Sequence, residues 1–231
     1  MKKRGRRIMD STNSNVHITE TSRDNTYEYL KHIGEPIPKS KLIWKRLLDI
    51  LFGVIGLIIS APFILVFGII IKLTSPGPVF FKQERVGYMG KNFKVIKLRS
   101  MRNDAEAKTG AVWAKKNDPR VTPVGRFMRK TRIDEMPQFW NVLKGDMSLV
   151  GPRPERPELT EKFYKQWPEF PQRLRIIPGI TGYAQVNGGY DISPEEKCHL
   201  DNYYIKHYSF LFDIKIALQT IKTMFTGDGA R

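Results

Sequence analysis

The sequence lacks the residues that redox, zinc and P-loop chemistry need. Cys198 is the one cysteine among 231 residues, so no disulfide can form within the chain. The four histidines are scattered, and no zinc ligand set has workable spacing. Walker A and dinucleotide-binding motifs are missing, and no internal repeat is visible. These absences give no support to an oxidising compartment, a zinc enzyme, a P-loop or dinucleotide-binding fold, or a repeat protein.

Acidic residues are scarce in the first part of the chain, and this explains most of the net charge of +16. Residues 1–46 hold 11 Lys/Arg against 5 Asp/Glu, residues 72–132 hold 16 against 4, and residues 133–231 hold 12 against 13. The excess suits an anionic membrane leaflet, at roughly 1 kcal/mol per basic residue, or phosphorylated substrates. A solvated basic face would give the same composition. Nucleic acid is not an expected partner, because the most basic stretch, 94–132, has few aromatics for base stacking.

Charge is absent from one run, Ile50 to Ile71, whose 22 residues reach the membrane range of about 20. Pro62 near its centre removes a backbone hydrogen bond and predicts a bend. The first arm would be about 18 Å long, too short for a hydrocarbon core of about 30 Å. Basic residues flank both ends, so the positive-inside rule favours neither orientation. We therefore expect a re-entrant helix broken at Ser60 to Pro62; the alternative is a kinked spanning helix in which Ser60 satisfies freed carbonyls.

The rest of the chain divides around this run. Residues 1–40 are expected to form a flexible basic arm, 41–73 the re-entrant membrane helix and 74–231 a cytoplasmic catalytic domain. Trp44, Lys45 and Arg46 are placed as an interfacial anchor. The patterns predict a hairpin across 87–90, a helix over 123–144 ended by Gly145, helices over 159–167, 195–206 and 211–225, and loop with a short strand over 178–188.

The predicted fold is mixed α/β and mostly helical, with one catalytic domain and amphipathic interfacial helices. The last predicted helix is amphipathic, and its apolar face could cover the domain core or lie on the membrane surface.

Two adjacent carboxylates, Asp134 and Glu135, are the first candidates for catalysis. Neighbouring residues of a helix project about 100° apart, so the two need different roles. Asp134 suits nucleophilic attack on phosphorus, and Glu135 suits binding of a Mg²⁺ that neutralises a diphosphate. Pro137 suggests that the pair begins a helix, where free N–H groups favour phosphate, although acids at a helix start also serve as caps. The basic residues available to bind phosphate oxygens are Lys97, Arg99, Arg129, Lys130, Arg132 and Arg153.

Several long motifs follow one another in a characteristic order. They are KRLLDI with the proline-containing apolar segment, SPGPVFFKQERVG, FKVIKLRSM, RIDEMPQFWNVLKGDMSLVGPRP, RIIPGITGYAQVNG and LDNYYIKHYSFLFDIKI. With them, residues 41–226 resemble the bacterial sugar transferase family, the monotopic phosphoglycosyl transferases that begin polyprenol-linked glycan assembly. The chain resembles the short form of that family. It departs in one place, because the family often has serine directly before the central proline and this chain has Ser60-Ala61-Pro62.

The resemblance implies a reaction in two steps. Asp134 would attack the diphosphate of a UDP-hexose, release UMP and carry a phosphosugar that undecaprenyl phosphate then removes. Glu135 would bind Mg²⁺ (or Mn²⁺), and phosphate or substrate contacts would come from Lys97, Arg99, Arg132, Arg153, Gln185, Asn187 and Asp201. For Gln185, Asn187 and Asp201 the alternative is ordinary turn and sheet hydrogen bonding.

The implied location is the cytoplasmic face of the bacterial inner membrane, at the first step of exopolysaccharide, capsule or another lipid-linked glycan. A homodimer and docking to downstream glycosyltransferases are further expectations. A membrane-anchored basic binding or scaffold protein without catalysis is the alternative from another class, but it gives no reason for an acidic pair followed by GPRP.

Overall fold

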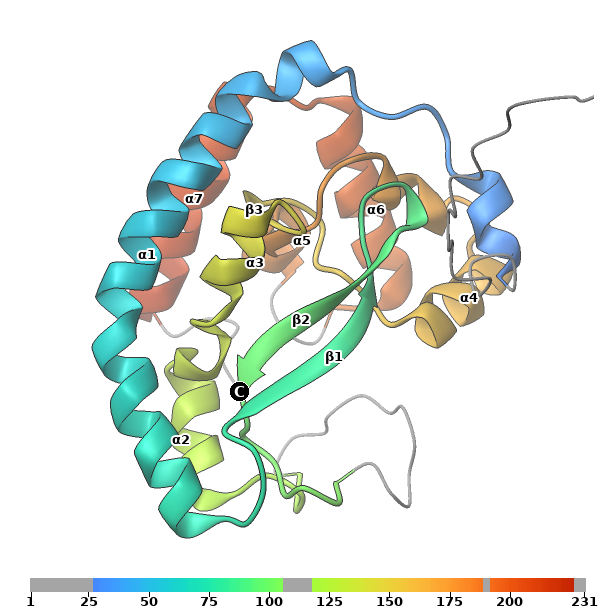
Figure 1. The fold of residues 1–231 in the computed structure, drawn as a ribbon. Coiled ribbons are helices and arrows are strands. Elements are labelled where there is room, and N and C mark those ends of the chain that lie inside the picture. The colour runs from blue at the N-terminus through green and yellow to red at the C-terminus, as the bar shows by residue number, and fades with distance from the viewer. Residues whose placement is uncertain (1–26, 106–117, 189–191, 227–231) are drawn as a thin grey trace, which may run out of the picture.

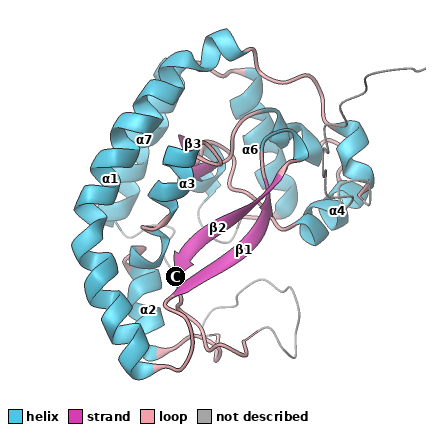
Figure 2. Ribbon diagram, in the orientation of Figure 1, coloured by secondary structure: helices cyan, strands magenta, loops and turns pink. Residues whose placement is uncertain are grey.

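A computed structural model describes residues 27–105, 118–188 and 192–226. In chain order the elements are η1 Glu28–His32, α1 Lys39–Thr74, β1 Phe80–Val86, η2 Tyr88–Gly90, β2 Asn92–Leu98, α2 Pro123–Lys130, η3 Ile133–Glu135, α3 Gln138–Lys144, β3 Ser148–Val150, α4 Pro157–Gln166, η4 Phe170–Arg175, β4 Gly179–Thr181, α5 Tyr183–Gly188, α6 Pro194–Lys206 and α7 Phe210–Thr226. The described part is mostly helical with two small two-stranded sheets (Figure 2), which confirms the mixed α/β class. The predicted basic arm lies largely outside the described residues.

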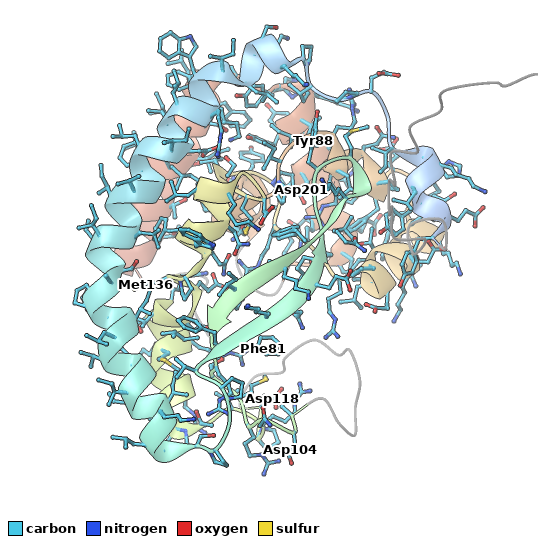
Figure 3. All side chains as sticks on the ribbon, viewed as in Figure 1. Phe81, Tyr88, Asp104, Asp118, Met136 and Asp201 are labelled. Atoms are coloured by element: carbon cyan, nitrogen blue, oxygen red, sulfur yellow. The ribbon has the colours of Figure 1, made fainter. Side chains whose placement is uncertain are left out.

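The long apolar helix α1 forms one edge of the molecule (Figure 1). Of its most apolar 18-residue stretch only 17% is buried inside the protein, so it is not the core helix of a soluble domain. Apolar side chains project from its outer face (Figure 3), among them Ile58 and Leu65, which are 68% and 66% exposed. The backbone stays helical through Pro62, so the two predicted arms are joined in one continuous helix, which curves along its course in Figure 1. Ser60 Oγ donates to the Gly56 carbonyl at 2.6 Å, which is the local satisfaction that a proline inside a helix needs.

The inner face of α1 packs on α3 through small residues. A Cβ added to Gly56 would lie 2.5 Å from a ring carbon of Phe139, so only glycine allows this approach. Arg46 donates to the carbonyls of Val142 and Leu143, both at 2.7 Å, at the C-terminal end of α3. Arg46 therefore binds protein, and its predicted role as a headgroup anchor is corrected.

The predicted hairpin is confirmed as β1 and β2, which pair antiparallel from Phe80 opposite Leu98 to Val86 opposite Asn92. The second sheet pairs β3 with β4 in parallel. The expected short strand within 178–188 is β4, but the residues after it form helix α5 rather than loop. The hairpin crosses the middle of the molecule, with α2 and α3 between it and α1 (Figure 1).

The single helix predicted over 123–144 is wrong in its middle. The structure has α2, the one-turn η3 and α3 in this range. Arg132 has left-handed backbone (φ 57°, ψ 15°), which ends regular helix, and Pro137 cannot donate the next helical hydrogen bond. Gly145 ends α3 with φ 87°, as predicted. Helices α4, α6 and α7 confirm the remaining three helix predictions.

Helix α7 has two apolar faces. Ile216 is fully buried against the domain, so the helix covers the core. Leu211, Leu218 and Ile221 are 74%, 62% and 53% exposed on the outside, so the helix also presents an apolar stripe beside α1. One face of α7 therefore covers the domain core, and the other is free of the core and could lie on the membrane surface.

Candidate active site

The acidic pair lies in η3, immediately before α3 rather than in its first turn. The flanking residues fix its position: Ile133 packs with Ile71 of α1 and Leu98 of β2, and Met136 packs on the same cluster. Figure 3 places Met136 between α1 and the rest of the domain. Asp134 is thereby held close to the C-terminal half of the apolar helix.

Glu135 is clamped by two cations. Lys97 Nζ donates to Glu135 Oε1 at 2.6 Å, and Arg153 makes a forked contact through Nη2 to Oε1 and Nη1 to Oε2. Burial alone would raise the pKa of Glu135, but Arg153 and Lys97 outweigh it and hold the pKa well below its usual range. Glu135 is therefore an anion at any pH near neutrality.

Asp134 has the opposite environment. It is 5% exposed, and none of the described residues donates a hydrogen bond to its carboxylate. Burial, and then the neighbouring charge of Glu135, raise the pKa of Asp134 to about 6, although Lys97, Arg129 and Arg153 lower it. Two adjacent carboxylates with pKa values pushed apart are typical of groups with different chemical roles.

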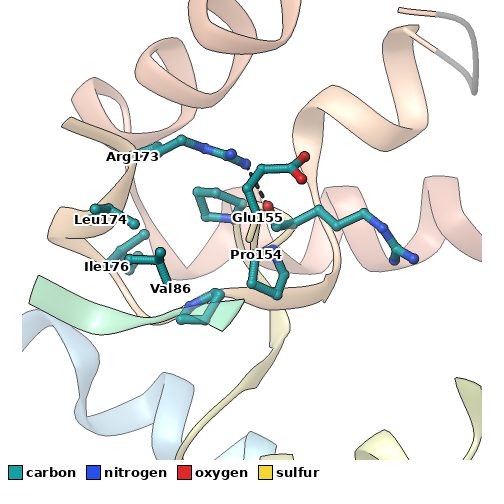
Figure 4. Close-up of a pocket in the computed structure, with 9 residues that line it drawn as sticks. Val86, Pro154, Glu155, Arg173, Leu174 and Ile176 are labelled. Carbon is teal, nitrogen blue, oxygen red and sulfur yellow. Dashed lines mark hydrogen bonds between the residues drawn. The ribbon is translucent and has the colours of Figure 1, made fainter. Parts of the chain in front are cut away.

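Arg153 belongs to the segment GPRPE, residues 151–155, which several buried groups hold in place. Arg173 Nη2 donates to the Arg153 carbonyl at 2.6 Å (Figure 4). Arg85 donates to the Pro154 carbonyl at 3.0 Å, and Glu155 accepts from Lys197. The pKa of Glu155 falls to about 2, because Lys197 and Arg85 overcome the effect of its burial. The loop that carries Arg153 is thus rigidly supported.

Asp201 supports the site at a distance. It is 1% exposed, and its carboxylate pairs with Arg173 at 2.7 Å. Arg173 in turn bonds the Arg153 carbonyl. The described contacts of Asp201 are with this arginine and not with the acidic pair. Asp201 is therefore linked to Glu135 only indirectly, through Arg173 and Arg153.

The other predicted site residues differ in their placement. Arg99 is buried, and its guanidinium donates to the carbonyls of Ser75 and Pro76 just after α1. Gln185 donates to the Ile180 carbonyl at 3.0 Å, and Asn187 to Tyr183 at 2.8 Å. Arg132 forms the left-handed turn directly before the acidic pair. The structure thus brings Lys97 and Arg153 onto the acidic pair, and it gives Arg99, Gln185 and Asn187 hydrogen bonds to nearby backbone.

Two buried charges on α1 were missed by sequence reasoning. Lys45 and Asp49 are 4% and 3% exposed, although both precede an apolar membrane segment. Their spacing of four residues, continued by Gly53 and Gly56, was the available signal, because it places them on one helical face with small residues that allow close packing. Lys45 is therefore not the interfacial anchor that was predicted.

The sequence model of the bacterial sugar transferase family matches residues 40–227. The chain belongs to this family. Its relatives include the UDP-N-acetylgalactosamine-undecaprenyl-phosphate N-acetylgalactosaminephosphotransferase of Aeromonas hydrophila, 47% identical over 81% of this chain and 45% of that protein. A UDP-glucose:undecaprenyl-phosphate glucose-1-phosphate transferase of Caulobacter vibrioides is 39% identical over 85% of this chain and 76% of that protein.

Another family member, the UDP-glucose:undecaprenyl-phosphate glucose-1-phosphate transferase of Escherichia coli, is 40% identical over 84% of this chain and 43% of that protein. The chain spans about half the length of several of these curated relatives. The relatives' names share the lipid undecaprenyl phosphate and differ in the sugar.

Proposed function

We propose that the chain transfers a sugar 1-phosphate from a UDP-sugar to undecaprenyl phosphate through a covalent phosphosugar on Asp134. One observation carries this proposal: a buried carboxylate that accepts no hydrogen bond from the described residues lies beside a second carboxylate that two cations clamp. The names of the relatives supply the two substrate classes.

In the first step a carboxylate oxygen of Asp134 attacks the phosphorus that bears the sugar. A bond forms between this oxygen and phosphorus, the bond from phosphorus to the bridging oxygen breaks, and UMP leaves with that oxygen. In the second step a phosphate oxygen of the lipid attacks the same phosphorus, and Asp134 leaves as a carboxylate. The product is a lipid diphosphate sugar, and the enzyme is restored.

The raised pKa of Asp134 suits this nucleophile. With a pKa of about 6, the group is ionised at neutral pH yet more basic than an ordinary aspartate. Because Asp134 accepts no hydrogen bond from the described residues, little has to be broken before it reacts. Lys97 and Arg153 would move from Glu135 toward the diphosphate oxygens and neutralise their charge.

The site fits Mg²⁺ (or Mn²⁺) only together with a substrate. Among the described residues no group of three or more His, Cys, Asp or Glu can hold a metal ion. Mg²⁺ commonly uses one or two carboxylates plus substrate phosphates, and Glu135 with Asp134 beside it can supply the protein's share. When bound, the ion would neutralise the diphosphate charge during transfer. The weaker contact to Glu135 Oε2, at 3.4 Å, leaves this oxygen available.

We also propose that α1 is re-entrant at the cytoplasmic face of the bacterial inner membrane, and the contacts of α1 support the re-entrant position. Lys45 near its start and Ile71 near its end both pack on the same domain. Since a polar domain lies on one side of a bilayer, we propose that both ends of α1 lie on that side and that its outer apolar face contacts lipid. The acidic pair then lies near headgroup level, where UDP-sugar and lipid phosphate can meet for the first step of a glycan pathway.

The test is to incubate the protein with a UDP-sugar and Mg²⁺ without lipid acceptor and to measure intact mass. We expect a phosphosugar adduct that maps to Asp134, together with one UMP per adduct. Asp104→Asn is the matched control, because this aspartate is 72% exposed and lies outside the site. Turnover in the presence of lipid without any adduct in its absence would refute the covalent step. A protein that neither releases UMP nor turns over would favour the non-catalytic binding role.

A further inference from the structure

The outer edge of strand β3 is bonded by side chains of the membrane helix. Among the described strands, β3 pairs with β4 alone, along one of its two edges. On the other side Asp49 Oδ1 accepts from the Leu149 N–H at 2.8 Å, and Lys45 Nζ donates to the Val150 carbonyl at 2.6 Å. Asp49 also accepts from Ser148 Oγ at 2.9 Å. Two charged residues of α1 thus bond β3 where a neighbouring strand would.

The bonded strand leads directly into the active site. Val150 is followed by Gly151 and Pro152, and then by Arg153, whose guanidinium holds Glu135. Close backbone packing fixes the path, because a Cβ on Gly151 would lie 2.4 Å from the Ile177 carbonyl oxygen. A shift of β3 toward or away from α1 would therefore carry Arg153 with it.

We propose that Lys45 and Asp49 are positioning residues, which register the GPRPE segment against the membrane helix and so fix Arg153 over Glu135. This inference rests on the proposed function, because it assigns them a part in phosphoryl transfer. They touch neither the acidic pair nor a reacting atom in the described contacts. Their effect passes through β3 to Arg153.

The helix α7 completes the arrangement. Lys45 Nζ also pairs with Asp213 Oδ2 at 2.8 Å, and Tyr204 donates to Asp213 Oδ1 at 2.6 Å. The lysine is therefore oriented from behind by a buried acid, which leaves one of its protons aimed at the Val150 carbonyl. A buried ion pair used only for stability is often replaceable by well-packed apolar residues of similar volume, so such a replacement tests whether this pair has a positioning role.

A pair of near-isosteric substitutions separates the two roles. In Asp49→Asn the amide oxygen can still accept from Leu149 and Ser148, while Asp49→Leu removes both bonds. A second variant, Lys45→Met with Asp213→Asn, removes the donor to Val150 and replaces both members of the buried Lys45–Asp213 ion pair together, and its Asn still accepts from Tyr204. This second variant keeps the test decisive if the leucine protein does not fold.

Two measurements are made on full-length protein in nanodiscs. Hydrogen exchange of the peptide over 148–156 reports whether the segment is anchored, and it does not depend on catalysis. The rate of adduct formation, measured in the native background and in an Arg153→Ala background, reports whether the effect passes through Arg153. If it does, the variants slow a protein that has Arg153 and have little further effect on one that lacks it. A smaller folded fraction would instead lower the rate by the same factor in both backgrounds.

We expect Asp49→Asn to match wild type in both measurements. We expect Asp49→Leu and the double variant to exchange faster over 148–156 and to form adduct about 10 to 100 times more slowly when Arg153 is present. In the Arg153→Ala background we expect the same variants to change the rate little. Unchanged exchange, or an equal fold loss in both backgrounds, would overturn the proposal. A wild-type protein that forms no adduct would instead refute the proposed function, and the exchange data would then still decide whether α1 anchors the segment.

Discussion

Replacing Asp134 by asparagine should abolish phosphosugar transfer and at the same time stabilise the protein. Each pKa unit corresponds to about 1.4 kcal/mol, so a rise from 3.8 to about 6 makes the ionised carboxylate destabilising by about 3 kcal/mol. Asparagine removes the charge and keeps the shape of the side chain, but it buries a polar amide. We therefore expect the free energy of unfolding to rise by about 2 kcal/mol. For a chain of this size that corresponds to about 4 to 8 °C in Tm.

The sign of the effect depends on pH. Below pH 3.8 the carboxyl is protonated in both the folded and unfolded protein, and asparagine should change little. Between pH 3.8 and about 6 the folded state holds the proton more tightly, so wild-type stability falls as pH rises. Above pH 6 the penalty is complete, and the advantage of asparagine should be constant.

The assay is thermal unfolding of both proteins in one detergent at pH 4.5 and pH 8, with adduct formation measured on the same samples. Asp104→Asn again serves as the exposed control and should leave Tm unchanged at both pH values. The reasoning would be refuted if Asp134→Asn were no more stable relative to wild type at pH 8 than at pH 4.5. Retained transfer in this variant would separately refute the role of nucleophile.

Three further predictions concern α1 and the turn before the acidic pair. Single cysteines introduced by Lys41→Cys and Lys72→Cys, both exposed, should label from the same side of sealed vesicles in a cysteine-free background; labelling from opposite sides would rule out re-entry. Gly56→Ala should lower the free energy of unfolding by about 1 to 3 kcal/mol, because its Cβ overpacks against α3. Gly68→Ala is the control: its Cβ would meet a side chain at 3.2 Å, and its free energy of unfolding, measured by thermal unfolding, should lie within about 0.5 kcal/mol of wild type. Arg132→Asn should keep the left-handed turn and leave the Tm unchanged, because asparagine tolerates this backbone conformation. If Arg132 binds phosphate, adduct formation should be about 10-fold slower or more in this variant. An unchanged rate would mean that Arg132 serves only to form the turn.

Local patterns were enough to predict the parts of the site that depend on neighbours in sequence. The alternating run over residues 93–98 and the glycines after Val86 predicted the hairpin that carries Lys97. The adjacent pair Asp134 and Glu135 could be singled out because two carboxylates in one turn cannot share a single role. That Lys97 and Arg153 both reach Glu135 agrees with the prediction that basic residues converge there.

Features that depend on distant partners could not be read in the same way. Lys45 next to an apolar run has the composition of a headgroup anchor, and only the presence of Val150, 105 residues away, makes it a buried donor. Asp201 has the same limitation, because its partner Arg173 is on another element. The left-handed backbone of Arg132 had no signal either, since arginine is not a residue type that favours it.

The same packing explains both the reactivity and the location of Asp134. Ile133 and Met136 on either side of the acidic pair are drawn onto the C-terminal half of α1, and this removes water from Asp134. Desolvation raises its pKa and makes it a better nucleophile, while the contact that causes it also holds the group beside the membrane helix. A substitution that loosens this contact should therefore weaken nucleophilicity and access to the lipid substrate together, which is why the apolar residues around the pair matter as much as the charged ones.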